Sequence, residues 1–199
     1  VGAAANNFIG GNGVTTLSNG NYVVRSQNAG VGGAVTFGSG TTGVSGVLSA
    51  ANSLVGTTGF DFVGFNDITE LANGNYVVST GNWDNGAVVN AGAVTFGSGT
   101  TGVSGAISAA NSLVGTTAGD FVGNVTALTN GNYVVASPNW SNGAASQAGA
   151  VTFGNGTTGI TGAVSAANSL VGTTAGNNVG SDGVTALTNG NYVVRSSLW

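Results

Sequence analysis

The sequence contains no cysteine, no histidine and no methionine, and its one proline is Pro138. Without cysteine and histidine it lacks the Ser-His-Asp and Cys-His arrangements of nucleophilic catalysis and the usual zinc ligands. The absence of cysteine also excludes disulfides. Any acid–base chemistry would depend on six acidic residues scattered along 199 positions, so we expect no enzyme activity.

Charge is equally scarce: 4% of the residues are charged, and the formal net charge is −4. The two cations, Arg25 and Arg195, are too few for a nucleic-acid partner, because phosphate backbones are neutralised by several Lys or Arg side chains. No apolar run approaches the about 20 residues that cross a bilayer, so we expect no membrane insertion. The scarcity of cations and the lack of cysteine and methionine are typical of secreted, protease-exposed proteins, which predicts an extracellular or cell-surface location.

The abundant residues predict an all-β fold. The 38 glycines occur with many Thr, Ser, Asn, Val and Ala residues. Gly- and Asn-rich turns separate short runs that contain Val, Thr and Tyr, the residues favoured in strands. The sequence lacks the Glu, Lys and Leu content of a helical bundle.

The motif NGNY occurs four times and sets the frame of a repeat of about 57 residues. An Asn-Gly pair between alternating apolar residues is a strong hairpin signal, and we expect positive φ at both central positions of the turn. The residues of this repeat signature are Asn19, Gly20, Tyr22, Asn73, Gly74, Tyr76, Asn130, Gly131, Tyr133, Asn189, Gly190 and Tyr192. The frame predicts the tail of a preceding repeat at 1–13, full repeats at 14–67, 68–124 and 125–183, and the opening hairpin of a further repeat at 184–199.

Each full repeat offers about four strands, VTALT, NYVVAS, GAVTF and SLVGT in the third copy. The residues Tyr133–Ala136 are apolar or small on both faces, which predicts a central strand between two layers. Ala106–Val114 has apolar residues at helical spacing, and we expect a short helical turn that leads into a strand. Four short strands per unit favour β-propeller blades, with a β-solenoid or a stacked-sheet fibre as the alternative.

The number of repeats leaves the closure of the array open. Three and a half units are fewer than the 4–8 blades of most propellers. The alternatives are a four-bladed ring, a larger ring, two chains that share one ring, and head-to-tail addition of chains, which produces a filament when it does not close.

The run LTNGNYVVASPNW, followed by GAVTFGNGTTGITG and NSLVGTTAGD, resembles the Gly- and Asn-rich repeats of very large bacterial surface or secreted adhesin-like proteins. It is also similar in outline to FG-GAP and integrin-type propeller blades. The first resemblance implies a structural or adhesive segment of an extracellular protein. FG-GAP blades often carry a calcium loop of the DxDxDG type; this sequence has none, so the resemblance does not extend to calcium.

The acidic residues favour structural roles over catalysis or metal binding. Asp61 and Asp120 are equivalent positions at which other repeats have Asn7 and Asn177, and a position that accepts Asp or Asn is typical of an Asx turn or cap. Asp67 and Glu70 could hold a cation weakly, but a solvated rim is the simpler interpretation. We therefore expect no metal and no cofactor.

Trp83, Trp140 and Trp199 each follow the tyrosine of their repeat by seven residues. On a common surface they could stack on sugar rings, and between repeats they would cover the apolar layer. Ala29 takes their place in the first repeat. Arg25 and Arg195 share a position that holds Ser79 and Ala136 in the other copies, which predicts a position that faces solvent or lies at an end of the array. The GTTG runs are interpreted as turns, since no Gly-Lys-Ser/Thr follows them.

The sequence therefore predicts a non-catalytic structural or adhesive repeat segment, which could assemble head-to-tail into fibres. Its expected partners are neighbouring repeats of a longer chain or further copies of itself. The alternative is a carbohydrate-binding propeller module that uses the three tryptophans to bind glycans.

Overall fold

The computed structural model describes residues 1–2, 7–66 and 68–199, and in that part of the chain it contains strands and turns but no helix. The predicted all-β class is confirmed. The strands are β1 (Val14–Thr16), β2 (Tyr22–Ser26), β3 (Ala34–Gly38), β4 (Leu54–Val55), β5 (Ile68–Glu70), β6 (Tyr76–Thr80), β7 (Ala93–Gly97), β8 (Gly105–Ala106), β9 (Ser112–Val114), β10 (Asn124–Ala127), β11 (Tyr133–Ser137), β12 (Ala150–Gly154), β13 (Gly162–Ala163), β14 (Ser169–Val171), β15 (Val184–Ala186) and β16 (Tyr192–Val194).

Each full repeat forms one antiparallel sheet of four strands. The strand orders are β1-β2-β3-β4, β5-β6-β7-β9 and β10-β11-β12-β14, and β15 and β16 pair as a hairpin. The first two sheets each gain a fifth strand from the following repeat, because β8 pairs in parallel with β4 and β13 pairs in parallel with β9. The tandem four-stranded repeats are therefore confirmed. Each following repeat adds a two-residue strand to the sheet of the repeat before it.

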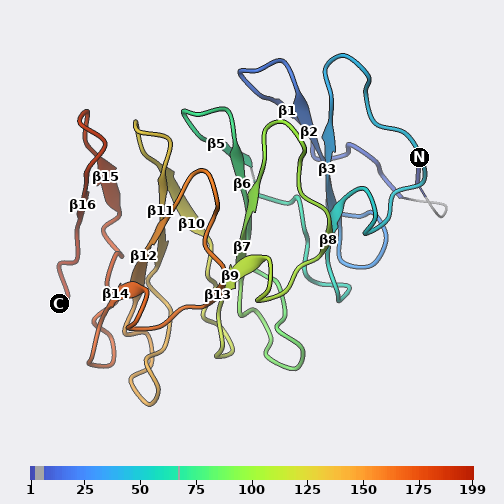
Figure 1. Cartoon of the computed structure of the whole chain (residues 1–199). Helices are drawn as coiled ribbons and strands as arrows, with labels where there is room; N and C mark the ends of the chain where they lie inside the picture. Colours follow the sequence, from blue (N-terminus) through green and yellow to red (C-terminus); the bar gives the residue numbers. More distant parts are fainter. Residues whose placement is uncertain (3–6, 67) are drawn as a thin grey trace.

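The four sheets lie side by side in a row, with the two termini at opposite ends (Figure 1). The hairpin turns lie along the upper edge of this view, and the loops that follow β6 and β11 lie along the lower edge. The row does not close on itself. It has the order in which consecutive blades of a propeller, or sheets of a stack, follow one another.

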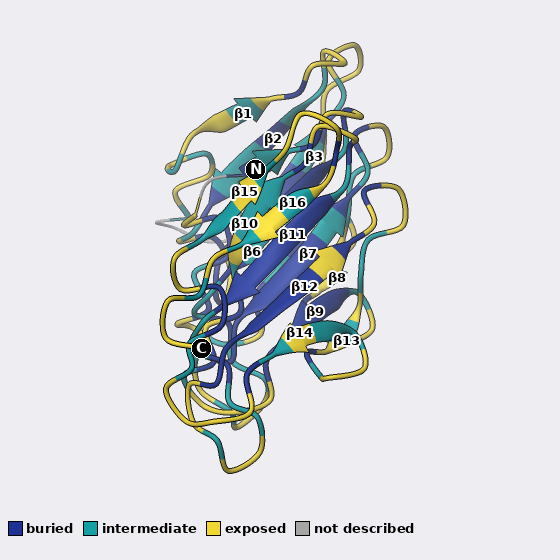
Figure 2. Cartoon of the chain, turned by 90° about the vertical axis from the view of Figure 1, so that its left-hand side faces the viewer, coloured by how far each residue is buried: buried dark blue, intermediate teal, exposed yellow. Residues whose placement is uncertain are grey.

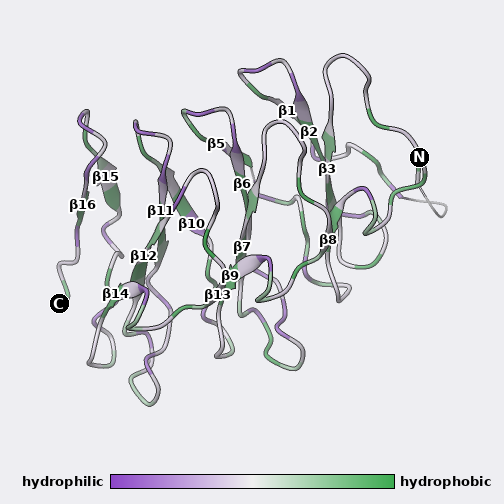
Figure 3. Ribbon diagram, viewed as in Figure 1, coloured by the Kyte–Doolittle hydropathy of each residue, from purple (hydrophilic) through white to green (hydrophobic). Residues whose placement is uncertain are grey.

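Three apolar layers fill the spaces between neighbouring sheets. Strand β6 serves two of them, because Tyr76 and Val78 belong to the first layer and Val77 to the second. In the third repeat, all residues of β11 are buried, which confirms the strand predicted at Tyr133–Ala136. Exposed residues gather in the loops around the buried strands (Figure 2), and hydrophobic residues concentrate along the strands (Figure 3). One sheet cannot bury both of its faces alone, so the repeats depend on each other for a core.

The hairpin turn differs in detail from the expectation. Gly20 has a φ of 85°, whereas Asn19 does not adopt a positive φ. The N–H of Gly20 donates to Leu17 O, and the N–H of Leu17 donates to Asn21 O. This is a three-residue loop, a type I turn followed by glycine in the left-handed region. Glycine alone therefore takes the positive φ, and the asparagine side chain is left for other contacts.

The segment Ala106–Val114, expected as a short helical turn leading into a strand, forms no helix but a single turn, in which the N–H of Ser112 donates to Ser108 O, followed by the expected strand. The segment begins in β8, turns at residues 109–111 and ends in β9. Asn111 closes the turn, because its Oδ1 accepts the N–H of Ser108 and its Nδ2 donates to Ala106 O. The apolar residues at helical spacing, Ile107 and Leu113, are both buried, Ile107 directly after β8 and Leu113 in β9.

Candidate functional site: the junction between repeats

In each of the three full repeats, the tyrosine of the NGNY motif lies directly opposite the glycine that ends the third strand. The pairs are Tyr22 with Gly38, Tyr76 with Gly97, and Tyr133 with Gly154. A Cβ atom built on any of these glycines would overlap the tyrosine ring. The ring therefore covers glycine backbone that no other side chain would shield, as aromatic residues do in designed sheets.

The same tyrosine ring faces the preceding repeat. Tyr76 and Tyr133 are fully buried, Tyr76 in the first apolar layer and Tyr133 in the second. Burial raises the pKa of the Tyr133 phenol to about 12, and the backbone of Ile160 lowers it in part. The phenol stays neutral at physiological pH and acts as packing.

A glycine of the GTTG turn packs against the preceding repeat. A Cβ atom on Gly102 would lie 2.5 Å from Cβ of Phe37, and one on Gly159 would lie 2.6 Å from Cβ of Phe96. Both phenylalanines end a GAVTF strand and pack against the apolar layer on that side. The repeated GTTG run is a turn, as predicted, and its second glycine lets two repeats approach.

Along the upper edge, two asparagines of one repeat bind the backbone of the next. Asn73 Nδ2 and Asn75 Nδ2 donate to the Gly156 carbonyl oxygen at 2.7 and 2.8 Å. Asn75 Oδ1 accepts the N–H of Gly99 in its own repeat at 2.9 Å. One side chain therefore fixes a turn in its own repeat and a turn in the next. We call this arrangement the asparagine clamp.

The asparagine clamp recurs at the first junction and is incomplete at the last. Asn19 and Asn21 donate to Gly99 O at 2.6 and 2.8 Å. At the third junction, Asn130 Nδ2 donates to Gly190 O at 3.0 Å and Asn132 Oδ1 accepts the N–H of Gly156. Asn132 Nδ2 finds no acceptor in the described part of the chain. The last repeat thus leaves half of the clamp unused.

Loss of the clamp in the middle of the array should be costly. We expect Asn75→Ala to lower the free energy of unfolding by about 1–3 kcal/mol, because it leaves the N–H of Gly99 without a partner and removes one of the two hydrogen bonds to the Gly156 carbonyl. Asn191→Ala is the matched control: it removes the equivalent side chain of the last repeat, which makes no hydrogen bond with any described residue. Urea unfolding followed by tryptophan fluorescence compares the two, and equal effects would contradict the role of the clamp.

Along the lower edge, the position that accepts either Asp or Asn forms a second link. Asp120 Oδ2 accepts the N–H groups of Thr116 and Thr117 at 3.0 and 2.8 Å, which caps a turn in its own repeat. Its Oδ1 accepts the N–H of Ser141, the residue after Trp140 in the next repeat. Burial raises the pKa of Asp120, and the same three N–H groups lower it in part.

The equivalent side chains make the same kind of contact. Asp61 accepts the N–H groups of Thr57, Thr58 and Asp84, and Asn177 accepts those of Thr173 and Thr174. An acceptor oxygen is the shared requirement, and both residue types supply one. The predicted turn-capping role of this position is therefore confirmed, and a catalytic role for Asp61 or Asp120 has no support in these contacts.

The sugar-stacking interpretation of the tryptophans is wrong for two of the three. Trp83 and Trp140 are 3% and 4% exposed, and they belong to the first and second apolar layers. A ring enclosed between two sheets offers no face to a ligand. Trp199 is 64% exposed, but it is a single ring without partners on a common surface. Trp83 and Trp140 instead cover the apolar layers between repeats, which is the other role that the sequence allowed.

The expected solvent-facing role of the Arg25 position is also wrong. Arg25 Nη1 donates to Asn66 O at 3.1 Å, in the loop that leads to the second repeat. At the same position of the second repeat, Ser79 Oγ donates to Gly123 O. Two different side chains thus hold the connection to the following repeat. Arg195 is the equivalent residue of the last repeat and is exposed.

Of the remaining acidic pair, Asp67 and Glu70, the structure describes only Glu70. Glu70 Oε1 accepts the N–H of Ser18 and so joins the first two repeats. Asp67 lies outside the described residues. Among the described residues, no group of three or more His, Cys, Asp or Glu side chains could hold a metal ion.

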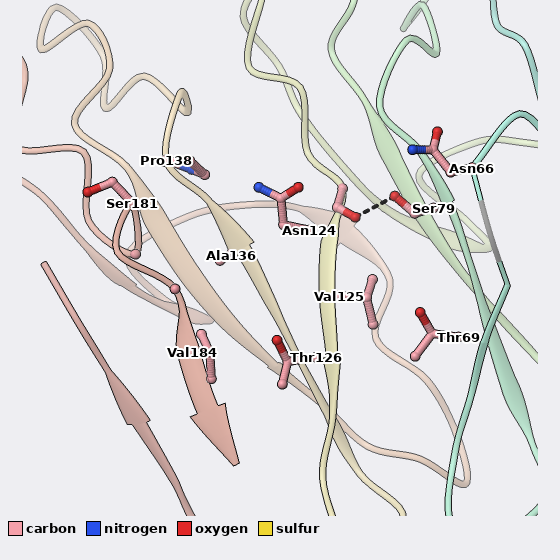
Figure 4. A pocket seen from close by; sticks show the side chains of 13 residues that line it. Asn66, Thr69, Ser79, Asn124, Val125, Thr126, Ala136, Pro138, Ser181 and Val184 are labelled. Carbon is pink, nitrogen blue, oxygen red and sulfur yellow. Dashed lines mark hydrogen bonds between the residues drawn. The ribbon is translucent and has the colours of Figure 1, made fainter.

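A groove of about 500 Å³ lies beside the first strands of the last three repeats. Figure 4 shows Thr69, Asn124, Thr126 and Ser181 around it, with Ser79 bonded to the Gly123 backbone. The described side chains that line this groove are neutral. Its described lining can donate and accept hydrogen bonds but includes no ionisable side chain. In the described residues, no helix is long and apolar enough to cross a membrane.

Sequence reasoning identified the signature residues but missed their partners across the junction. The signal for the asparagine clamp was the second asparagine of NGNY, which a hairpin turn does not require. The strands β8 and β13, which pair with the preceding repeat, have only two residues each, Gly and Ala. So short a segment has no sequence pattern from which a strand could be predicted.

The comparisons with known proteins agree with this repeat frame. The model of a family described as a repeat of unknown function (DUF5650) matches residues 16–65, 70–124, 127–181 and 186–199. No curated protein matches the chain significantly. The family matches start just after the beginning of each hairpin and together cover most of the sequence, so the chain belongs to this family of DUF5650 repeats.

Proposed function

We propose that this chain is a non-catalytic structural segment, a rod-like spacer built by open stacking of repeats. The proposal rests on two contacts that recur at successive junctions: the asparagine clamp, and the short parallel strand that each following repeat adds to the sheet before it. Because each repeat contacts the following repeat through the same groups, further units can be added in one direction. Such an array grows by nearest-neighbour interfaces.

The non-catalytic part of the proposal rests on residue chemistry. The sequence has no histidine and no cysteine, and the carboxylates of Asp61 and Asp120 are used as backbone caps. The groove beside the first strands is lined by neutral side chains where the structure describes it. These features favour packing over reaction chemistry.

The proposed setting is the cell surface or the extracellular space, in an adhesin-like protein. It is supported by the low charge, the absence of cysteine and methionine, and the likeness to Gly- and Asn-rich surface repeats. The partners in this setting are neighbouring repeats of the same stack. A glycan partner that stacks on the three tryptophans is not part of the proposal, because two of the rings are buried.

Small-angle X-ray scattering tests the open stack. We compare chains in which residues 68–183, two complete repeats, occur once, twice and three times. Because packed sheets lie about 10 Å apart, each added pair should lengthen the particle by about 20 Å. A maximum dimension that stops growing would indicate closure into a ring and would contradict the spacer.

A further inference from the structure

The sequence contains eight Asn-Gly pairs, and asparagine is a chemically labile residue. Because glycine has no side chain, its backbone nitrogen can approach the side-chain carbonyl carbon of the asparagine before it. The structure decides which of the eight pairs are free to react in this way. Their asparagines are Asn12, Asn19, Asn73, Asn85, Asn130, Asn142, Asn155 and Asn189.

In the four NGNY pairs, hydrogen bonds hold both of the groups that would react. In the first repeat, the N–H of Gly20 donates to Leu17 O, and Asn19 Oδ1 accepts the N–H of Asn21. The other three repeats make the same two bonds at the equivalent residues. A nitrogen that donates its N–H and an amide that is fixed by its oxygen are both kept from attack.

Two further pairs, at 12–13 and 155–156, are held in the same two ways. Their glycine N–H groups donate to Gly10 O and to Asn132 Oδ1, respectively. Their asparagine Oδ1 atoms each accept a backbone N–H. Six of the eight pairs are therefore restrained at the glycine nitrogen and at the asparagine amide.

The pairs Asn85-Gly86 and Asn142-Gly143 lack both restraints. The N–H groups of the two glycines make no hydrogen bond with any described residue, and neither do the Oδ1 atoms of the two asparagines. Both glycines are exposed. The pairs have equivalent places in the loops that follow β6 and β11, along the lower edge of the row (Figure 1). The first repeat has a shorter loop there, with no Asn-Gly pair.

The amide nitrogens of Asn85 and Asn142 fasten the tips of these loops. Asn85 Nδ2 donates to Gly115 O at 3.0 Å, and Asn142 Nδ2 donates to Gly172 O at 2.9 Å. Each bond joins the loop to the residue that follows the last strand of the same repeat. A carboxylate accepts hydrogen bonds but does not donate them. Exchange of the amide for an acid would therefore place two acceptor oxygens against each other.

We propose that Asn85 and Asn142 are sites of spontaneous deamidation, and that their conversion releases the tips of the two loops. The inference is independent of the proposed spacer function. Each conversion also adds a negative charge to a chain in which only 4% of the residues are charged. The released loops become the most acidic and most mobile part of the lower edge.

The reaction needs water and no other partner. The nitrogen of Gly86, after loss of its proton to hydroxide, attacks Cγ of Asn85 and closes a five-membered succinimide ring. The side-chain nitrogen takes up a proton from water and leaves as ammonia. Water then opens the ring at one of its two carbonyl carbons, which gives aspartate or isoaspartate. The same steps join Gly143 to Asn142.

The attack requires the loop tip to open, and the opening is local. It breaks the bond from Asn85 to Gly115 and the pair of backbone bonds between Asn85 and Val88, all within one repeat. Opening an NGNY turn would also break the asparagine clamp, which joins two repeats. Exposed loops open at low cost compared with elements that are packed on a neighbour.

Peptide mapping by mass spectrometry tests the sites in the full, folded chain, incubated at mildly alkaline pH. We expect Asn85 and Asn142 to convert at least about tenfold faster than the other six asparagines. Tenfold corresponds to about 1.4 kcal/mol, the scale of the hydrogen bonds that hold the six pairs. The chain unfolded in guanidinium chloride is the control, and there we expect the eight rates to converge. Equal rates in the folded chain, or the same difference in the unfolded chain, would overturn the proposal.

Hydrogen exchange at the Val88 amide tests the release, because this N–H donates to Asn85 O within the loop tip. Asn85→Asp represents the product, and we expect faster exchange at Val88 with the strands unchanged. Asn28→Asp is the matched control: it adds the same charge at an exposed asparagine that makes no hydrogen bond with a described residue. Unchanged exchange in Asn85→Asp, or an equal increase in Asn28→Asp, would contradict the release of the loop.

Discussion

Tyr133→Ala is expected to lower the free energy of unfolding by about 3–5 kcal/mol, the range for removal of a large aromatic side chain from a core. Tyr133 is fully buried in the middle apolar layer, and its ring covers Gly154 across the sheet. Its removal leaves a cavity and uncovers glycine backbone at once. Because native stabilities are about 5–15 kcal/mol, this change removes a large part of the total.

The position of Tyr133 in the array adds a second expected result. The middle layer joins the second and third sheets, so its loss weakens the one interface between the two halves of the row. Stability in repeat proteins is a sum of units and interfaces, and a weak interface divides the unfolding transition in two. Guanidinium unfolding followed by circular dichroism and by tryptophan fluorescence should then give two transitions in place of one.

Tyr192→Ala provides the matched control for this substitution. Tyr192 has the same place in the repeat but is only partly buried, and its ring stacks on Phe153 at the end of the row. We expect a loss of less than half that of Tyr133→Ala and a single transition. A loss as large as that of Tyr133→Ala would show that the tyrosine acts within its own repeat and not through the junction.

Gly156→Ala is expected to be as damaging, with a loss of about 3 kcal/mol, at the upper end of the range for overpacking. A Cβ atom on Gly156 would overlap the carbonyl oxygen of Gly131. The obstacle is the backbone of a tight turn, which cannot move aside as a flexible side chain can. Displacing Gly156 would also break its hydrogen bonds with Asn73, Asn75 and Asn132.

Thermal unfolding by circular dichroism measures this effect, with Gly81→Ala as the control. A Cβ atom on Gly81 would meet no heavy atom within 4 Å, and Gly81 does not adopt a positive φ. We expect Gly81→Ala to leave the midpoint nearly unchanged, because it adds a methyl group in open space. If Gly156→Ala were equally harmless, the close approach between neighbouring turns would not be part of the folded protein.

Much of the fold follows from local sequence chemistry. Short Val-, Thr- and Tyr-containing runs between Gly- and Asn-rich turns gave the all-β class, and the recurrence of NGNY gave tandem repeats. The positions of all four predicted strands agree with β10, β11, β12 and β14 in the third repeat and with their equivalents in the other two. These features depend on backbone preferences and on the alternation of side chains across a strand, which a sequence displays directly.

The candidate site required the tertiary structure, because its contacts join residues far apart in the chain. Asn19 and Gly99 are separated by 80 residues. The sequence allowed Trp83 and Trp140 to lie either on the surface or between repeats. Only the packing of one sheet on the next shows that both side chains are buried. The arginine position likewise varies from Arg to Ser, because each side chain reaches a backbone carbonyl of the loop that leads to the next repeat, which is a requirement of geometry and not of charge.

By itself, the sequence determined the secondary structure class, the length of the repeat and the absence of histidine and cysteine chemistry. The tertiary structure decided which of those repeated residues are buried. The eleven letters VTALTNGNYVV occur at both 125–135 and 184–194, yet Val134 is fully buried and Val193 is 47% exposed. Identical local sequence forms the same hairpin twice, but burial depends on the neighbouring sheet, and only the first of these hairpins has a sheet on each side.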